Sequence, residues 1–223
     1  MSARVVYLHG FASSPGSNKA RRFASALSAR GIEVTVPDLN EGDFAGLTLS
    51  RQLALLDRLA RDAAPPVLIG SSMGAYVAAL YAARTNRAAA LVLMAPAFGF
   101  IERWTGRMSA EALAEWERRG AMQVFHHASA RMEPIGWGLV EDARRYPAYP
   151  DVTAPTLVFQ GRSDESVPAV CAERFAEGRD NVTLHLLDSD HSLASAVDEI
   201  IGESFRFLVT WLPELAEDPG ATG

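Results

Sequence analysis

Short apolar runs alternate with amphipathic stretches along most of the chain, and this alternation restricts the fold more than any other feature. Helical periodicity separates the apolar runs. Because strands that alternate with helices pair in parallel, we expect a single α/β domain over residues 1–223, with helices on both faces of a mostly parallel sheet. The expected strands are residues 5–8, 33–36, 67–69, 90–94, 156–160 and 183–187, and the expected helices are 19–30, 49–63, 75–84, 169–176 and 194–211.

The alternation stops between residues 97 and 152, where no segment has the pattern of a strand. Helical patches occupy this stretch instead, and Ser109 has the features of an N-cap for one of them, over residues 109–119. A stretch of this length is rarely structureless inside a compact domain. The sequence therefore predicts a helical cap inserted between two core strands.

A Gly-x-Ser-x-Gly sequence, Gly70 to Gly74, lies between a predicted strand and a predicted helix. The order of strand, tight turn and helix is that of a nucleophile elbow, with Ser72 at its tip. The serine of such an elbow has a strained backbone, and side chains at the two glycine positions would collide with the adjoining strand and helix. We predict Ser72 as a nucleophile.

A serine hydroxyl needs a neighbouring base, and the chain has five histidines from which to choose. His191 lies in a polar loop between the last predicted strand and the last predicted helix. His185 falls inside that strand, His9 ends the first strand, and His126 and His127 fall in the insertion. Since only the loop histidine can follow both partners in the order serine, acid, histidine, we predict His191 as the base.

The acid that orients this histidine is expected on the neighbouring loop. Asp164 follows a predicted strand directly, whereas Asp188 and Asp190 are too close in sequence to His191 to reach its far ring nitrogen. An alternative role for Asp164 is to cap the helix that begins near Val167, which we expect to be incompatible with facing the histidine. We predict Asp164 as the acid.

Acyl transfer also needs two backbone N–H groups that point at the developing oxyanion. Met73 directly follows the nucleophile at the start of a helix, where the helix dipole adds to the field. The second donor is expected in the loop after the first strand, where Gly10 allows the backbone to approach closely. We predict the N–H groups of Phe11 and Met73 as the oxyanion hole.

These motifs, in this order, resemble the α/β-hydrolase superfamily. Residues 9–20 (HGFASSPGSNKA) and 70–74 (GSSMG) resemble the small bacterial YqiA-type esterases, and the core with its insertion is similar to the ABHD10-type acyl thioesterases and acyl-glucuronide esterases. The resemblance implies a triad of Ser72, Asp164 and His191. It leaves the substrate open.

Two features narrow the chemistry that the resemblance implies. The first loop lacks the His-Gly-Gly-Gly form of many lipases, and the nucleophile is serine rather than aspartate or cysteine. We therefore expect hydrolysis of a carboxylic ester or thioester through an acyl-enzyme on Ser72, with no cofactor and no metal. The open alternatives are an acyltransferase or peptidase with the same triad, and a non-catalytic binding protein on a hydrolase scaffold.

The insertion is rich in aromatic residues, which we expect to serve mostly for packing and in part to line an acyl pocket. Its arginines, at positions 103, 107, 118, 119, 144 and 145, are expected to form a solvated face, with binding of an anionic substrate tail as the open alternative. The apolar content of the cap would permit a homodimer.

Composition argues for an ordinary cytoplasmic protein that acts on small molecules. The net charge of −6 argues against a general nucleic-acid binder, and no apolar run has the length of a membrane span. The sequence shows no secretion signal, and Cys171 is the only cysteine. Residues 217–223 are expected to form a frayed tail.

Overall fold

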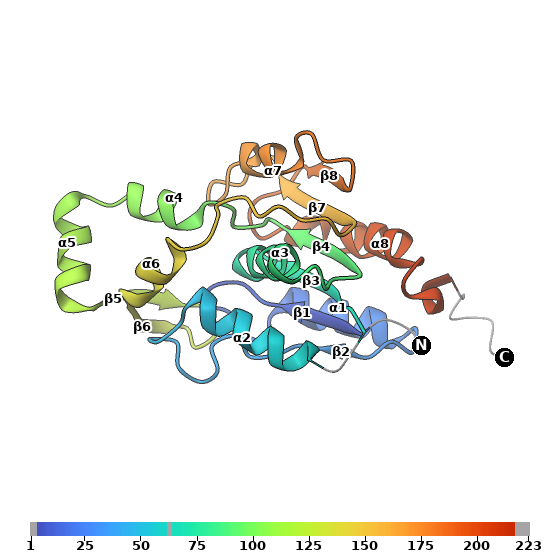
Figure 1. Ribbon diagram of the computed structural model, residues 1–223, viewed down its shortest axis with the longest axis horizontal. Coiled ribbons are helices and arrows are strands. Elements are labelled where there is room, and N and C mark those ends of the chain that lie inside the picture. Colours follow the sequence, from blue (N-terminus) through green and yellow to red (C-terminus); the bar gives the residue numbers. More distant parts are fainter. Residues whose placement is uncertain (1–3, 62–63, 217–223) are drawn as a thin grey trace.

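The computed structural model describes residues 4–61 and 64–216 and is built around one six-stranded sheet (Figure 1). The strand order is β2-β1-β3-β4-β7-β8, and each neighbouring pair is parallel. The parallel α/β architecture predicted from the sequence is thereby confirmed. The strands are β1 (Val5–Leu8), β2 (Val34–Thr35), β3 (Val67–Ser71), β4 (Ala90–Met94), β7 (Thr156–Gly161) and β8 (Val182–Leu187).

Helices cover both faces of this sheet because its buried strands are apolar on both sides. In β1, Val5 and Tyr7 pack toward one helical layer and Val6 and Leu8 toward the other. The first layer contains α1 (Asn18–Ser28) and α8 (Val197–Leu208), and the second contains α2 (Leu49–Ala60), α3 (Met73–Thr85) and α7 (Ala169–Ala176). Two short 3-10 helices, η1 (Ala194–Ala196) and η2 (Pro213–Ala216), flank α8.

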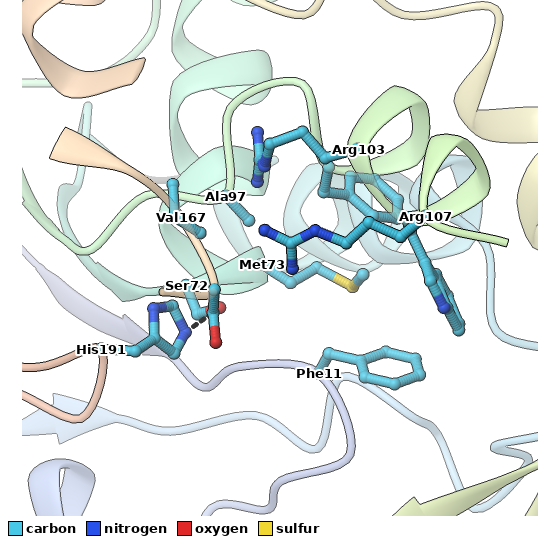
Figure 2. A pocket seen from close by; sticks show the side chains of 11 residues that line it. Phe11, Ser72, Met73, Ala97, Arg103, Arg107, Val167 and His191 are labelled. Carbon is cyan, nitrogen blue, oxygen red and sulfur yellow. Dashed lines mark hydrogen bonds between the residues drawn. The ribbon is translucent and has the colours of Figure 1, made fainter. Parts of the chain in front are cut away.

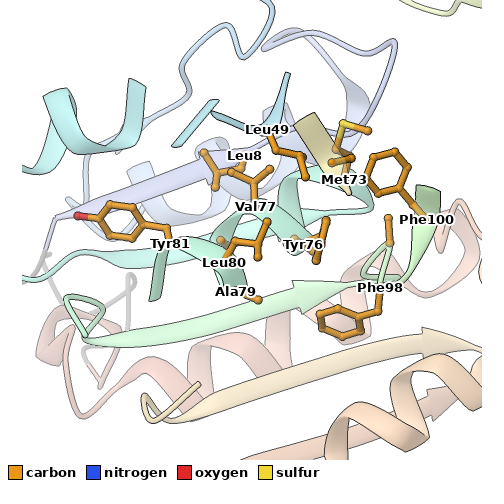
Figure 3. Packing of buried hydrophobic residues seen from close by; sticks show 14 of the residues in the cluster. Leu8, Leu49, Met73, Tyr76, Val77, Ala79, Leu80, Tyr81, Phe98 and Phe100 are labelled. Atoms are coloured by element: carbon orange, nitrogen blue, oxygen red, sulfur yellow. The ribbon is translucent and has the colours of Figure 1, made fainter. Parts of the chain in front are cut away.

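Helix α3 lies at the centre of the second layer, and its alanines allow it to pack closely against the sheet. Almost the whole helix is buried, from Met73 to Ala82. Figure 3 shows Leu8 of β1 and Leu49 of α2 close to Val77 of α3. Phe98 and Phe100, which follow β4, lie near the N-terminal end of the helix. The helix that follows Ser72 is therefore held by β1, by α2 and by the segment that follows β4.

The segment between β4 and β7, here called the cap segment (residues 97–152), is only partly helical. The prediction that it contains no strand was wrong, because β5 and β6 form an antiparallel hairpin that pairs Ala121 with Gly136 and His126 with Arg131. Apolar residues on its outer face, Phe125 and Met132, are exposed, and Pro134 stands within β6, so the sequence of this hairpin lacks the pattern of a core strand. Its elements are α4 (Phe100–Gly106), α5 (Ala110–Arg119), β5 (Ala121–His126), β6 (Arg131–Gly136) and α6 (Gly138–Ala143).

The predicted start of α5 is present, since the Ser109 hydroxyl accepts a hydrogen bond from the N–H of Ala112 at 3.2 Å. The other predicted elements differ from the observed ones by a few residues at their ends. The predicted helix over residues 49–63 ends earlier, at Ala60, and residues 62–63 lie outside the described residues, as does the predicted tail over 217–223.

The cap segment lies beyond the carboxyl ends of the sheet strands and is fixed to the core by buried polar contacts (Figure 1). The Asp142 carboxylate of α6 accepts hydrogen bonds from the backbone N–H of Ser50 at 2.8 Å and from its hydroxyl at 2.6 Å. The hydroxyl of the buried Tyr76 in α3 donates to the carbonyl of Pro147 in the cap segment at 2.8 Å. Across residues 4–61 and 64–216, no helix is long and apolar enough to cross a membrane.

Candidate active site

Ser72 occupies the sharp turn between β3 and α3. Its backbone angles, φ 54° and ψ −117°, are disfavoured for a residue with a Cβ atom. A Cβ at Gly70 would lie 2.5 Å from the Cα of Ala75, and one at Gly74 would lie 2.2 Å from the carbonyl oxygen of Leu8. The two glycines are therefore required by the close approach of α3 and β1, as the sequence predicts.

A continuous chain of hydrogen bonds joins Ser72 to His191 and Asp164. The Ser72 hydroxyl oxygen lies 3.1 Å from Nε2 of His191 (Figure 2). Nδ1 of the same ring lies 2.7 Å from the Asp164 carboxylate. Because an ionised carboxylate can only accept, Nδ1 carries the proton and Nε2 is free to accept one from the serine. The three side chains come from the loops after β3, β7 and β8, which end at the same edge of the sheet.

Asp164 is buried, and both of its carboxylate oxygens are fully used. Oδ2 accepts hydrogen bonds from His191 and from the side-chain amide of Gln160 at 2.8 Å, and Oδ1 accepts from the N–H groups of Ser166 at 2.9 Å and Val167 at 2.7 Å. Burial opposes ionisation of Asp164, but these hydrogen bonds outweigh it and lower the pKa of the carboxyl group. The alternative role as a helix cap is not observed, because α7 begins at Ala169 with Pro168 as its N-cap and has no side-chain cap. Oδ1 of Asp164 instead accepts from N–H groups in the turn before the helix, while Oδ2 faces the histidine.

The two predicted oxyanion donors flank the serine. Phe11 and Met73 line the same pocket as Ser72, and neither N–H group donates to another group in the described part of the chain. A Cβ at Gly10 would lie 3.3 Å from the Cβ of Ser72, so the loop after β1 comes close to this serine. In the described part of the chain, both N–H groups therefore remain without a hydrogen-bond acceptor beside the pocket.

Three polar residues near the site were not singled out from the sequence. His9 is buried beneath the loop after β1, accepts a hydrogen bond at Nε2 from the N–H of Leu39 at 3.1 Å and lies 3.0 Å from the carbonyl of Gly10. Burial lowers the pKa of this histidine. The ring therefore supports the loop that carries Phe11.

The other two contact the loops that carry His191 and Asp164. Lys19, the only lysine of the chain, donates from Nζ to the carbonyl of Ser192 at 2.8 Å, next to His191. Gln160 is the last residue but one of β7 and donates from its side-chain amide to the Asp164 carboxylate. Neither residue was easy to find from the sequence, because Lys19 is far from His191 along the chain and Gln160 lies in an apolar strand. The one signal for a special role was that Lys19 is the only lysine.

The remaining histidines and acids stand apart from the serine. His185 lies in β8 with its ring 5.4 Å from that of Phe159. In the cap hairpin, His126 is buried beside Ser129, and His127 is exposed. Asp190 accepts hydrogen bonds from the N–H and the hydroxyl of Ser192, so it shapes the histidine loop from within.

A pocket of about 310 Å³ opens beside Ser72 and His191. Its walls are mostly apolar, and helix α4 of the cap segment forms one of them. Two of the cap arginines, Arg103 and Arg107, line this pocket (Figure 2). The expectation of a solvated face was wrong for the half-buried Arg103, whereas Arg107 is exposed. The other lining residues are Phe11, Met73, Ala97, Phe100, Trp104, Ser166 and Val167.

No group of three or more His, Cys, Asp or Glu side chains among the described residues is arranged to hold a metal ion. A family model described as "Uncharacterised protein family (UPF0227)" matches residues 4–203. The chain belongs to the UPF0227 family. Comparison of this UPF0227 member with curated proteins gives no match.

Solved structures establish the fold of this UPF0227 protein. A protein from Agrobacterium vitis S4 matches it with a TM-score of 0.81 at 24% identity, over 93% of this chain and 88% of that one. Alpha/beta hydrolase domain-containing protein 10 from mouse matches with a TM-score of 0.77 at 20% identity, over 92% and 89% of the two chains. The α/β-hydrolase fold and the family resemblance predicted from the sequence are confirmed.

A third structure is Est1E from Butyrivibrio proteoclasticus with ferulic acid bound. It matches the UPF0227 chain with a TM-score of 0.79 at 17% identity, over 95% of this chain and 90% of the other. At this identity the similarity concerns the fold alone, and the chemistry must be argued from the residues of this chain.

Proposed function

We propose that this UPF0227 protein is a serine hydrolase that cleaves carboxylic esters or thioesters. The observation that carries the proposal is the hydrogen-bond chain from the Asp164 carboxylate through His191 to the Ser72 hydroxyl, with distances of 2.7 and 3.1 Å. A serine without a base is a weak nucleophile, and the order acid, imidazole, hydroxyl is the arrangement that activates it.

The first half of the reaction forms an acyl-enzyme. Ser72 Oγ attacks the carbonyl carbon while Nε2 of His191 takes the hydroxyl proton. The carbonyl oxygen becomes negative and is stabilised by the N–H groups of Phe11 and Met73. The intermediate then collapses, the bond to the alcohol or thiol breaks, and His191 returns the proton to that leaving group.

The second half releases the acid. A water molecule gives a proton to His191 and attacks the acyl-enzyme, and the proton passes back to Ser72 as the carboxylic acid leaves. Asp164 stays ionised throughout and stabilises the imidazolium, which its lowered pKa favours. No step requires a group from outside the chain other than water and substrate.

Two observations support an ester-type substrate. The pocket beside Ser72 is lined mainly by apolar side chains, including Phe11, Phe100 and Trp104, which suit an acyl or aryl group. Est1E, which has the same fold, is described with a carboxylic acid, ferulic acid, bound.

Replacement of Ser72 tests the proposal directly. We expect the wild-type protein to hydrolyse p-nitrophenyl butyrate and to react covalently with a fluorophosphonate probe. Because Ser72→Ala removes the nucleophile, we expect it to lower kcat at least about a thousandfold and to abolish labelling by the probe. Circular dichroism of the variant checks that it is folded. Hydrolysis or labelling that persists in the variant would refute the proposal.

A further inference from the structure

Helix α4 presents two arginines to the pocket beside the candidate nucleophile. Arg103 and Arg107 are four residues apart, so they share one face of the helix. Both side chains line the pocket, and Figure 2 shows the guanidinium group of Arg107 between Met73 and Val167 and that of Arg103 beside Ala97, farther from Ser72. The cap segment thus brings two positive charges to a site whose other walls are mainly apolar.

Neither charge is neutralised by the protein. Arg103 donates from Nη1 to the carbonyl of Phe98 and lies 3.7 Å from the sulfur of Cys171, while its Nε is buried without a partner in the described residues. Arg107 donates from Nη2 to the backbone carbonyl of Glu165 at 3.0 Å. Within residues 4–61 and 64–216, no carboxylate lies within 4.0 Å of either guanidinium group.

Other arginines of the cap segment do have acidic partners. Arg118 and Arg119 on α5 both pair with Glu115, and Arg145 pairs with Asp142. Two like charges on neighbouring turns repel each other, and the charge of the half-buried Arg103 is costly to leave unpaired beside apolar walls. The exposed Arg107 is open to solvent, so both arginines can accept an anionic partner from outside the protein.

A carboxylate matches this pair of donors. The guanidinium group is planar and binds a carboxylate through two parallel hydrogen bonds, and low-polarity walls strengthen the attraction. A carboxylate also carries a single negative charge, which costs less to bring into a pocket of about 310 Å³ with mainly apolar walls than the double charge of a phosphate.

We propose that the substrate of this site is an ester or thioester that carries a free carboxylate away from the scissile bond, and that Arg103 and Arg107 bind this carboxylate. The inference deepens the proposed function and rests on it for the hydrolytic step, but not for the binding. The carboxylate belongs either to the acyl group, as in a monoester of a dicarboxylic acid, or to the leaving group, as in an ester of a hydroxy acid.

Two pairs of matched esters test the proposal and distinguish these positions. For the acyl side, the p-nitrophenyl monoester of adipic acid is compared with the same ester of adipic monoamide. For the leaving group, the butyrate ester of 4-hydroxybenzoic acid is compared with that of 4-hydroxybenzamide. We expect kcat/KM for the carboxylate to exceed that for the carboxamide about tenfold or more in one pair, and added salt to reduce the ratio.

Variants assign the ratio to the two arginines. Arg103→Gln/Arg107→Gln is expected to bring the ratio close to one, and Arg107→Gln alone, at an exposed position, to lower it by part of that amount. The matched control is Arg118→Gln/Arg119→Gln, which changes the net charge equally on α5, away from the pocket, and should keep the wild-type ratio. The proposal would be overturned if the wild-type protein hydrolysed carboxylate and carboxamide esters with the same kcat/KM in both pairs. It would also be overturned if Arg103→Gln/Arg107→Gln kept the wild-type ratio of the two kcat/KM values.

Binding separates this proposal from the proposed function. The Ser72→Ala protein cannot form an acyl-enzyme on this residue, so calorimetric titration with the same four esters measures recognition alone. We expect tighter binding of the carboxylate in one pair, with the preference lost when the two arginines are also replaced by Gln. If the wild type showed no turnover but the binding preference remained, the proposed hydrolase function would be refuted and the carboxylate-binding site would stand. If carboxylate and carboxamide esters bound equally well in both pairs, the carboxylate-binding site would be refuted.

Discussion

At the scale of single residues, the candidate site depends on side chains that perform two tasks at once. The carboxylate of Asp164 closes the turn before α7 with one oxygen and orients His191 with the other. Burial raises the cost of this charge, and four hydrogen bonds offset it. An acid with so many partners cannot rotate, so the imidazole next to it is held in one orientation.

Replacement of Asp164 by asparagine should therefore keep the positions of the neighbouring side chains but prevent His191 from accepting the proton of Ser72. The N–H groups of Ser166 and Val167 hold the oxygen of the introduced amide, so its NH₂ group faces Nδ1 of the histidine and can only donate a hydrogen bond. His191 then carries its proton on Nε2 and cannot act as a base. We expect Asp164→Asn to lower kcat for p-nitrophenyl butyrate by about 10³ to 10⁴. Glu165→Gln, at the adjacent exposed position, serves as the control and should retain wild-type kcat; equal activity of the two variants would contradict the assignment.

Lys19 supports the histidine loop with a charge that is costly to bury. Burial lowers the pKa of Lys19 from 10.5 to about 8, although the attraction of Asp190 and Asp164 offsets part of the effect. Between pH 8 and 10.5 the unfolded chain therefore binds more protons at this residue than the folded chain does, and the free energy of unfolding rises with pH.

The variant Lys19→Met lacks this pH dependence. We expect the free energy of unfolding of the wild type, relative to that of the variant, to increase by about 2 kcal/mol between about pH 7.5 and about pH 10. Urea unfolding at the two pH values measures it. Lys19 is half-buried in the structure, and a difference between the two proteins that is the same at both pH values would show that its pKa is not lowered.

At the scale of elements, the order of strands and helices was predictable because each core element has a strong local pattern. In β1, β4 and β7 continuous apolar runs are bounded by polar segments, and the observed strands begin at the predicted residues. The β5–β6 hairpin was missed because exposed apolar residues, Phe125 and Met132, and a proline, Pro134, obscure its pattern. Burial does alternate along β5, where Met122 and Val124 pack against the core, but an apolar residue on the outer face hides this alternation in the sequence.

The same limit applies to the site. The positions of Ser72, Asp164 and His191 at the ends of three strands follow from motif and topology, both of which are local or regular. The placement of Arg103 and Arg107 toward the pocket instead depends on how α4 packs over the sheet. Helical periodicity shows that the two arginines share a face but gives no information on what that face meets.

The junction of β3 with α3 gives an element-scale prediction. In Gly74→Ala the new Cβ would meet the carbonyl oxygens of Leu8 at 2.2 Å and His9 at 2.5 Å, and these backbone atoms cannot move without displacing β1. We expect a loss of about 3 kcal/mol or more in the free energy of unfolding, measured by urea, together with loss of esterase activity.

The matched control is Gly202→Ala in the interior of α8, where a Cβ would meet no atom within 4 Å. There the substitution should stabilise the protein by about 0.5 to 1 kcal/mol because alanine favours the helix. Similar stability changes at the two glycines would show that the elbow is not closely packed.

At the scale of the whole molecule, the cap segment and the sheet share one hydrophobic cluster. Leu8 and Leu68 of the sheet belong to the same buried cluster as Trp116, Ile135 and Leu139 of the cap segment. A shared core favours joint unfolding, because separation of the cap would expose apolar surface on both parts.

The positions of the tryptophans allow this to be measured. Three of the four tryptophans, Trp104, Trp116 and Trp137, lie in the cap segment, and Trp211 lies near the C-terminal end of α8. Tryptophan fluorescence therefore reports mainly on the cap, whereas far-ultraviolet circular dichroism reports on the whole chain. We expect the two urea unfolding curves to coincide, and a fluorescence midpoint at lower urea would mean that the cap opens first.

The place of the cap segment between β4 and β7 also has a consequence during protein synthesis. The parts that build the elbow, from β1 to β4, are complete at Met94, whereas Asp164 and His191 follow the cap. A domain generally folds as a unit, so the elbow is not expected to be fixed before the rest of the shared core has left the ribosome. Because Asp164 and His191 follow the cap segment along the chain, the proposed triad can form only after β7, β8 and the loop behind them have been translated.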